Sequence, residues 1–284
     1  MTQISGAACL VTGAASGIGK ALAHELVAGG CDVAIADRDV PGLKALAGEL
    51  EVLTGRKVSA HAVDVGDRDQ MEVLAKEVVA IHPDLNILIN NAGVALFGQF
   101  NEIALADMEW LININFWGVV YGTRLLLPHL ARQRQAHIVN LSSIFGIIAP
   151  PGQTAYSAAK FAVRGLSEAL RHELDMARSP VRLSVVHPGG VATSIARNSR
   201  AGALIGDNRG QAEMIAAFER LADMTPQTAA RRIIRGIERN EPRILIGTDA
   251  RRADLVQRLL PASYWKVIAR SLEKALRRNK PDGG

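Results

Sequence analysis

Short apolar segments alternate with longer helical segments along most of this chain. The apolar segments are rich in Val, Ile, Leu and Ala on both faces, which is typical of strands buried inside a parallel sheet. They occupy residues 7–12, 33–36, 58–63, 87–89, 137–141, 183–186 and 243–246. The helical candidates between them include residues 18–28, 68–81, 106–134, 156–178 and 228–240. This alternation predicts an α/β fold, with a single doubly wound domain and a mainly parallel sheet.

The first predicted strand ends in TGAASGIGK, which places Gly13, Gly17 and Gly19 at the turn into the first helix. Glycine lets the backbone bend tightly and approach a pyrophosphate, whose charge is attracted by the amide groups at a helix N-terminus. The GxxxGxG spacing differs from the more common GxGxxG, and a purely structural turn could also use these glycines. The position between a strand and a helix favours a nucleotide-binding turn of a Rossmann-type domain.

The next predicted strand closes with Asp37 and Arg38. An acidic residue at this distance from the glycines can hydrogen-bond both ribose hydroxyls of an adenosine, and it repels a 2′-phosphate. The Arg38 guanidinium could instead accept the phosphate of NADP if Asp37 turned away. We therefore expect NAD as the cofactor, with NADP as the alternative.

Two polar turns follow the third and fourth predicted strands. Asp64 and Val65 end the third strand, and the sequence NNAG at residues 90–93 ends the fourth. Both lie at the carboxyl edge of the sheet, where ligands of open α/β folds bind. Ordinary turn chemistry is the alternative explanation.

Tyr156 and Lys160 stand four residues apart in the sequence AYSAAK, inside a predicted helix. Side chains with this spacing lie on one face, so the phenol and the ammonium can address the same small volume. A cation beside a phenol favours the phenolate and lowers its pKa. Because this spacing is common on helix surfaces, its meaning depends on the other motifs.

Taken together, these motifs resemble the short-chain dehydrogenase/reductase family. The ordered matches cover residues 5–195: TGAASGIG, Asp64-Val65, NNAG, NINFWG, IVNLSS, the Tyr156/Lys160 pair and HPGGVAT. The resemblance implies a catalytic tetrad of Asn115, Ser143, Tyr156 and Lys160. Asn113 and Ser142 are the neighbouring alternatives to the first two.

The resemblance also implies a cofactor site and a role for each catalytic residue. Tyr156 would transfer the proton, Ser143 would hold the substrate oxygen, and Lys160 would lower the phenol pKa and bind the ribose. Asn115 would help to hold a water near Lys160. The implied cofactor-binding residues are Gly13, Ser16, Gly17, Ile18, Gly19, Asp37, Arg38, Asp64, Val65, Asn91, Ala92, Gly93, Tyr156, Lys160, Pro188, Gly189, Val191 and Thr193.

The expected activity is that of an NAD(P)-dependent oxidoreductase, which interconverts an alcohol and a ketone or aldehyde by hydride transfer. Residues 92–100 and 144–155 are rich in apolar side chains at the expected substrate edge, which favours a lipophilic substrate. Residues 194–219 match the variable substrate loop of the family. A catalytically idle dinucleotide-binding sensor or scaffold is the alternative, but such a protein has no need of Ser143, Tyr156 and Lys160 together.

The sequence also predicts how the chain is divided into domains and which surfaces its C-terminal extension contacts. We expect residues 1–249 to form the dinucleotide-binding and catalytic domain and residues 250–284 to form a helical extension. The extension places Trp265, Ile268, Leu272 and Leu276 on one helical face. Docking of this face on the subunit or its partner is favoured over contact with an anionic membrane surface.

The helical segments 106–134 and 156–178 resemble those at the family's two-fold interface. This resemblance implies a homodimer or homotetramer, and the interface candidates are Trp117, Tyr121, Phe161 and Leu170.

Composition argues against several other classes of protein. The net charge is +5, but the basic residues gather towards the C-terminus, and only 4% of residues are aromatic. These features argue against a nucleic-acid binder. The two cysteines, Cys9 and Cys31, form no CxxC or Cys/His motif, so we expect no metal site and a reducing compartment. We expect a cytoplasmic protein, because neither a signal peptide nor a long apolar span is evident.

Overall fold

The computed structural model describes residues 2–202, 215–216, 219–220 and 222–278. Its centre is a parallel sheet with the strand order β3-β2-β1-β4-β6-β7-β9. The strands are β1 Ala8–Thr12, β2 Asp32–Asp37, β3 Val58–Ala62, β4 Leu85–Asn90, β6 Ala136–Leu141, β7 Val181–Pro188 and β9 Arg243–Ile246. The order runs outward from β1 in one direction and from β4 in the other, which confirms the predicted doubly wound fold.

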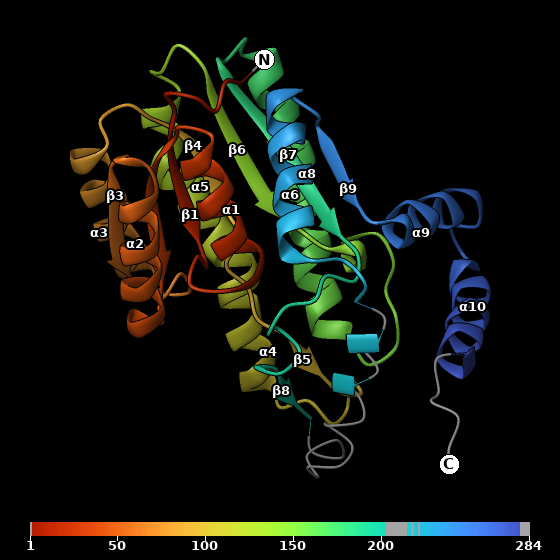
Figure 1. Cartoon of the computed structure of the whole chain (residues 1–284). Helices are drawn as coiled ribbons and strands as arrows, with labels where there is room; N and C mark the ends of the chain where they lie inside the picture. The colour runs from red at the N-terminus through yellow and green to blue at the C-terminus, as the bar shows by residue number, and fades with distance from the viewer. Residues whose placement is uncertain (1, 203–214, 217–218, 221, 279–284) are drawn as a thin grey trace.

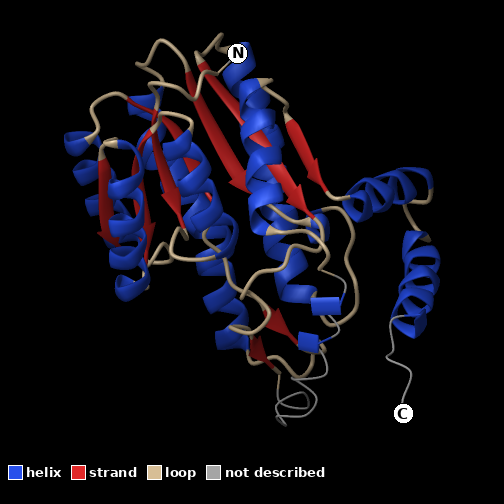
Figure 2. Ribbon diagram, in the orientation of Figure 1, coloured by secondary structure: helices blue, strands red, loops and turns tan. Residues whose placement is uncertain are grey.

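Helices cover both faces of the sheet (Figures 1 and 2). One face carries α1 Gly17–Ala28, α2 Val40–Thr54 and α8 Pro226–Glu238, and the other carries α3 Arg68–Ile81, α5 Gly118–Leu130 and α6 Thr154–Met176. Two hydrophobic clusters fill the layers. Cys9 and Val11 of β1 belong to one cluster, while Leu10 between them belongs to the other. This double burial explains why the strands are apolar on both faces.

Two helical regions differ from the sequence prediction. Helix α2 is an addition to the predicted helices, and it is capped by Asp39, whose side chain accepts a hydrogen bond from Gly42 N. The helix predicted over residues 106–134 ends at Leu130, and it consists of α4 Leu105–Ile112, the π-helical turn η1 Asn113–Trp117 and α5. A π-helical turn widens the helix locally and is frequent at functional sites.

The C-terminal residues form two helices beyond β9, as Figure 1 shows. Helix α9 spans Thr248–Leu259 and so runs across the expected domain boundary, and α10 spans Tyr264–Arg278. Tyr264 and Ile268 of α10 pack with Ile147 and Ile148, and Ala149 N donates a hydrogen bond of 3.0 Å to Tyr264 Oη. The start of α10 is therefore docked on its own subunit. The side chains of Leu272 and Leu276 lie outside the described residues.

A short parallel pair, β5 Leu96–Phe97 with β8 Arg200–Ala201, joins the end of the main sheet to the start of the expected substrate loop. Residues 203–214 of that loop lie outside the part of the chain that the structure describes. Within the described part, no helix has the length and apolar character needed to cross a membrane.

Candidate active site

The sequence-predicted site residues gather at the carboxyl ends of the parallel strands. The sheet order reverses between β1 and β4, and such a reversal is where open α/β folds bind ligands. The glycine turn follows β1, the NNAG turn follows β4, Ser143 follows β6, and Pro188 ends β7.

The glycines of the first turn are required by their surroundings. Gly13 and Gly17 have φ angles of 65° and 54°, in the left-handed region that favours glycine. A Cβ atom on Gly13 would lie 2.7 Å from Ala92 Cα, and one on Gly19 would lie 2.1 Å from the Gly13 carbonyl oxygen. A Cβ on Gly17 would approach Thr193 Cγ2 to 3.2 Å. The turn therefore packs tightly against the NNAG turn and faces the segment after Pro188.

Asn91 and Thr12 join the ends of β1 and β4. Asn91 Nδ2 donates to the carbonyl oxygens of Thr12 at 2.9 Å and Gly13 at 3.0 Å. Thr12 Oγ1 accepts hydrogen bonds from Asn91 N at 3.0 Å and Ala92 N at 3.1 Å. Thr12 is a structural member of the site that sequence reasoning missed. Its position directly before Gly13 was the available signal.

The Asp37 carboxylate faces the glycine turn. Asp37 Oδ2 accepts a hydrogen bond of 3.0 Å from Ala15 N, and Oδ1 accepts one of 3.1 Å from Asp39 N. Arg38 is exposed. The carboxylate is therefore turned towards the expected adenosine side of the site and not away from it.

Asp64 and Val65 stabilise the turn that follows β3. Asp64 Oδ1 accepts a 2.9 Å hydrogen bond from Gly66 N, and Val65 is buried against Gly118, where an added Cβ would lie 2.9 Å from Val65 Cγ2. This turn brings helix α5 against the strand end.

Tyr156 and Lys160 lie on one face of α6, as their spacing predicts. The Lys160 ammonium lies 5.6 Å from the centroid of the Tyr156 ring, and Lys160 Nζ donates a 3.0 Å hydrogen bond to the Leu141 carbonyl oxygen. Phe145 packs edge-on against the Tyr156 ring with a centroid distance of 6.1 Å. The ammonium is thus fixed between the end of β6 and the tyrosine.

Burial controls the proton affinities of this pair. Loss of water raises the pKa of Tyr156 to about 12, and a hydrogen bond to Ser143 acts in the opposite direction. Burial lowers the pKa of Lys160 to about 8. The raised phenol pKa is opposite to the lowering expected from the neighbouring ammonium, because the loss of water is the largest influence on the phenol.

Ser143 and Asn115 are each held by backbone groups. Ser143 Oγ accepts a 3.1 Å hydrogen bond from Phe145 N at the start of the 3-10 turn η2 Ile144–Gly146. Asn115 lies in η1 and is completely buried. Its side chain donates to Val94 O at 2.9 Å and accepts from Val94 N at 2.8 Å. These bonds tie the NNAG turn to η1.

Gly93 lies between Asn115 and Lys160. A Cβ atom there would be 3.2 Å from Asn115 Oδ1 and 3.6 Å from Lys160 Nζ. The end of β4, the turn η1 and helix α6 therefore meet at one point. The four residues implied as a tetrad are brought together around it and around the Ser143–Tyr156 contact.

Comparison with known proteins identifies the family of this chain. The family model described as short chain dehydrogenase matches residues 7–203. SadH of Mycobacterium tuberculosis, which is named as an oxidoreductase, is 40% identical over 96% of this chain and 98% of its own length. The chain belongs to the short-chain dehydrogenase family. Its sheet with helices on both faces is the fold of these oxidoreductases.

Solved structures of short-chain dehydrogenases superpose on this chain over most of its length. One from Burkholderia phymatum, in complex with NAD, has a TM-score of 0.80 and 29% identity, and covers 100% of this chain and 99% of its own. One from Burkholderia cenocepacia, in complex with NADP, has a TM-score of 0.74 and 25% identity, and covers 88% of this chain and 100% of its own.

The geometry of this short-chain dehydrogenase separates the alternatives that the sequence left open. Ser142 Oγ donates a 2.8 Å hydrogen bond to the Lys160 carbonyl oxygen, so it is occupied by the helix backbone, whereas Ser143 bonds to Tyr156. Asn113 is exposed, whereas Asn115 is buried beside Gly93. Both observations favour the residues that the resemblance implies.

The segment after β7 is held by a residue that sequence reasoning missed. Gly189 N donates to Ile246 O at 2.9 Å, and Gly190 N donates to Asp249 Oδ2 at 2.7 Å. A Cβ atom on Gly189 would lie 2.1 Å from the Asp249 carboxylate. Val191 is buried and pairs with Met224. Asp249 lies in α9, so only the tertiary structure reveals its contact with this turn.

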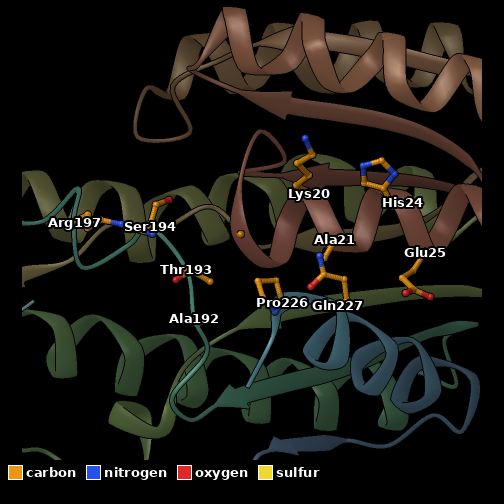
Figure 3. Close-up of a pocket in the computed structure, with 11 residues that line it drawn as sticks. Lys20, Ala21, His24, Glu25, Ala192, Thr193, Ser194, Arg197, Pro226 and Gln227 are labelled. Atoms are coloured by element: carbon orange, nitrogen blue, oxygen red, sulfur yellow. The ribbon is translucent and has the colours of Figure 1, made fainter. Parts of the chain in front are cut away.

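A cavity of about 390 Å³ opens beside the glycine turn (Figure 3). Lys20 and His24 of α1 line one side, and Thr193 and Arg197 line another, while Gly17 also contributes to the lining. The cavity lies at the phosphate end of the expected cofactor site and not at Tyr156. Within the described residues, no group of three or more His, Cys, Asp or Glu side chains could hold a metal ion.

Proposed function

We propose that this protein is an NAD(P)-dependent oxidoreductase that interconverts an alcohol and a ketone or aldehyde. The observation that carries the proposal is the partly buried Tyr156 with the buried Lys160 beside Ser143, at the carboxyl edge of a sheet whose glycine turn faces Thr193. The nicotinamide cofactor supplies or accepts the hydride when it is bound. The protein's own residues would hold the cofactor and move the proton.

The residues present fit such a cofactor. The glycine turn leaves Gly17 partly exposed, while the buried Gly19 has no room for a side chain, and the turn opens a helix whose N-terminus attracts phosphate. Asp37 would accept the adenosine ribose hydroxyls, and Lys160 would bind the nicotinamide ribose. Ser16, Ile18, Asp64, Val65, Asn91, Ala92, Pro188, Gly189 and Val191 would line the path between these ends.

The three catalytic side chains divide the proton chemistry among them. Because the pKa of Tyr156 is raised to about 12, the phenol keeps its proton at neutral pH and can donate it to a carbonyl oxygen during reduction. Ser143 Oγ accepts from Phe145 N, and its hydroxyl, which bonds to Tyr156 in the structure, would turn its hydrogen to the substrate oxygen. Lys160 stabilises the negative charge that develops on the phenol oxygen.

The expected preference is for NAD over NADP, because the Asp37 carboxylate already points at the glycine turn and would repel a 2′-phosphate. Fluorescence titration should show tighter binding of NADH than of NADPH, and Asp37→Ala should narrow the difference. Asp39→Ala is the matched control, because it removes the cap of α2 and should leave the preference unchanged. A wild-type preference for NADPH would assign the phosphate to Arg38.

The substrate is proposed to be lipophilic. Val94, Ile144 and Phe145 are partly buried beside the site, whereas Leu96, Ile147 and Ile148 are buried core residues. A screen of aliphatic and aromatic alcohols and ketones with both cofactors, read by the absorbance of the reduced nicotinamide, tests the activity.

Tyr156→Phe should abolish turnover and leave NADH binding unchanged. Turnover of this variant within about threefold of wild type would contradict the catalytic role of Tyr156.

We also propose a cytoplasmic homodimer or homotetramer. Trp117 of η1 and Phe161 of α6 expose 41% and 39% of their surface, whereas Tyr121 and Leu170 pack partly against the core. The first two are therefore the better interface candidates. Light scattering should give a dimer or tetramer, and Phe161→Arg should weaken it. A monomer at micromolar concentration would contradict the proposal.

A further inference from the structure

The backbone carbonyl of Ser143 has two hydrogen-bond donors. Gly146 N donates at 2.9 Å and closes the turn η2, and His187 Nδ1 lies 2.9 Å from the same oxygen. His187 is completely buried near the end of β7, the neighbour of the strand that leads into Ser143. The imidazole is therefore a long-range support for the residue that begins η2.

The chemistry of the two partners defines the tautomer. A carbonyl oxygen can only accept, so His187 Nδ1 must carry the hydrogen. His187 Nε2 is buried and has no hydrogen-bond partner in the described part of the chain. Burial is the main cause of a pKa lowered to about 4, so the ring is neutral at neutral pH. The single N–H group of the neutral ring therefore donates its hydrogen bond to the Ser143 carbonyl oxygen.

Fixing this carbonyl also fixes the Ser143 side chain. The residue has extended backbone angles of −168° and 168°, between the end of β6 and the turn. Its Oγ accepts from Phe145 N, and its hydroxyl bonds to Tyr156. With the carbonyl held from one side and the hydroxyl from the other, the direction of the Cα–Cβ bond is set. A catalytic group must be held to within about 0.5 Å, so such a support affects the rate.

We propose that His187 is a positioning residue for the reaction: its Nδ1–H group holds the Ser143 carbonyl and thereby places the Ser143 hydroxyl beside Tyr156. Its ring is completely buried, and its hydrogen bond is to the Ser143 backbone. The expected effect of His187 on turnover rests on the proposed oxidoreductase function. The expected position of the Ser143 side chain and the tautomer of His187 do not depend on that function.

Two substitutions of similar shape separate positioning from packing. In His187→Asn the amide nitrogen can take the place of Nδ1 and donate to Ser143, whereas His187→Leu has nearly the same volume and no donor. The Asn variant leaves a buried polar oxygen, so the Leu variant should be at least as stable in thermal unfolding. Positioning predicts the opposite order for turnover. With the best substrate of the screen, Asn should stay within about threefold of wild type, and Leu should lose about 10- to 100-fold in kcat with NADH affinity unchanged.

Three results would overturn the inference. They are a Leu variant with wild-type kcat, an Asn variant as impaired as Leu, and activities that follow thermal stability.

Two further measurements need no turnover. Nitrogen NMR of histidine-labelled protein should show His187 protonated at Nδ1 and bare at Nε2, and the reverse tautomer would refute the contact. Crystal structures should show Ser143 Oγ unmoved with Asn and displaced by more than about 0.5 Å with Leu. If the screen finds no substrate, the proposed function fails, while these two measurements still decide the role of His187.

Discussion

The proposed catalytic side chains of this protein are held mainly by backbone groups. Lys160 bonds to the Leu141 carbonyl, Asn115 bonds twice to Val94, and Ser143 accepts from Phe145 N. Each of these partners lies at or just beyond the end of a strand, so the sheet edge itself orients the site. The side chains then need few contacts with one another, which leaves their polar atoms available for ligands.

Lys160 provides a residue-scale test of the cofactor assignment. Lys160→Met keeps much of the buried stem and removes the ammonium, which burial already disfavours. We expect turnover to fall about 100-fold or more and NADH affinity to weaken, because one group serves both the phenol and the ribose. Fluorescence titration and steady-state kinetics measure the two effects. Loss of turnover with unchanged affinity would show that the ribose contact is wrong.

Gly19 tests the glycine turn at the same scale. In Gly19→Ala the added Cβ would lie 2.1 Å from Gly13 O and 2.5 Å from Asn91 Nδ2, so the turn must shift. We expect weaker NADH binding and a stability loss of about 1–3 kcal/mol.

Gly48→Ala is the matched control for this substitution. Gly48 is exposed in α2 with nothing within 4 Å, and it should gain about 0.5–1 kcal/mol from the higher helix propensity of alanine. Urea unfolding measures both variants. A neutral Gly19→Ala would mean that the turn is more adaptable than its packing indicates.

At the scale of elements, the C-terminal helices support the segment between Ser143 and Tyr156. Ile147 and Ile148 pack with Ala253 of α9 and with Tyr264 and Ile268 of α10. Asp249, in the first turn of α9, holds the turn after β7 through Gly190 N. The extension is therefore joined to the domain at two places close to the candidate active site.

Adjacent residues of α10 test this docking. Ile268 packs in the cluster, whereas Val267 is 40% exposed. We expect Ile268→Ser to lower stability by about 1–2 kcal/mol, because it removes buried apolar surface, and Val267→Ser to change it much less. Thermal unfolding compares the two. Equal effects would contradict docking, and binding of wild-type protein to anionic vesicles that Val267→Ser abolishes would favour the membrane alternative.

At the scale of the whole molecule, helices cover both faces of the sheet, and polar groups are therefore buried deep in the fold. Asn90 of β4 donates to Thr123 of α5 and to Asn140 of β6, and Asn140 donates to Ser167 of α6. His137 of β6 is also fully buried and lies within hydrogen-bond distance of Thr2 and Ser184. Such groups make stability depend on solution conditions as well as on packing.

The buried histidines predict acid sensitivity. Burial lowers the pKa of His137 to about 3 and that of His187 to about 4, from an ordinary value near 6.5. Because the unfolded chain binds protons that the native state excludes, the stability is fully present above about pH 6.5 and falls as the pH drops towards these values. The loss is on the order of 2 kcal/mol for each histidine by pH 5.

Thermal unfolding at pH 7 and pH 5 measures this loss. His137→Asn is the control: it should be less stable than wild type at pH 7 and lose less between the two pH values. The other titrating groups are common to both proteins, so the difference isolates His137. An identical pH dependence in the two proteins would contradict the prediction.

The sequence alone determined the layered fold and the location of most site residues, because both follow from local patterns. Strands buried on two faces must be continuously apolar, and the turns at their ends must carry glycine, asparagine and aspartate. Tyr156 and Lys160 share a face because of the helical repeat, and no distant contact is needed to place them together. Helix α2 escaped these patterns, since Pro41, Gly42 and Gly48 lower its intrinsic helix propensity and packing of residues such as Leu46 compensates.

Only the tertiary structure decided which neighbouring residue serves the site and what supports it. Ser142 and Ser143 are adjacent and chemically equal, and they differ because one faces the backbone of α6 and the other faces Tyr156. The contact of His187 with Ser143 spans 44 residues, and that of Tyr264 with Ala149 spans 115. Burial also reversed the expected direction of the Tyr156 pKa shift. Such contacts and desolvation depend on how distant elements pack together, and no short stretch of sequence contains that information.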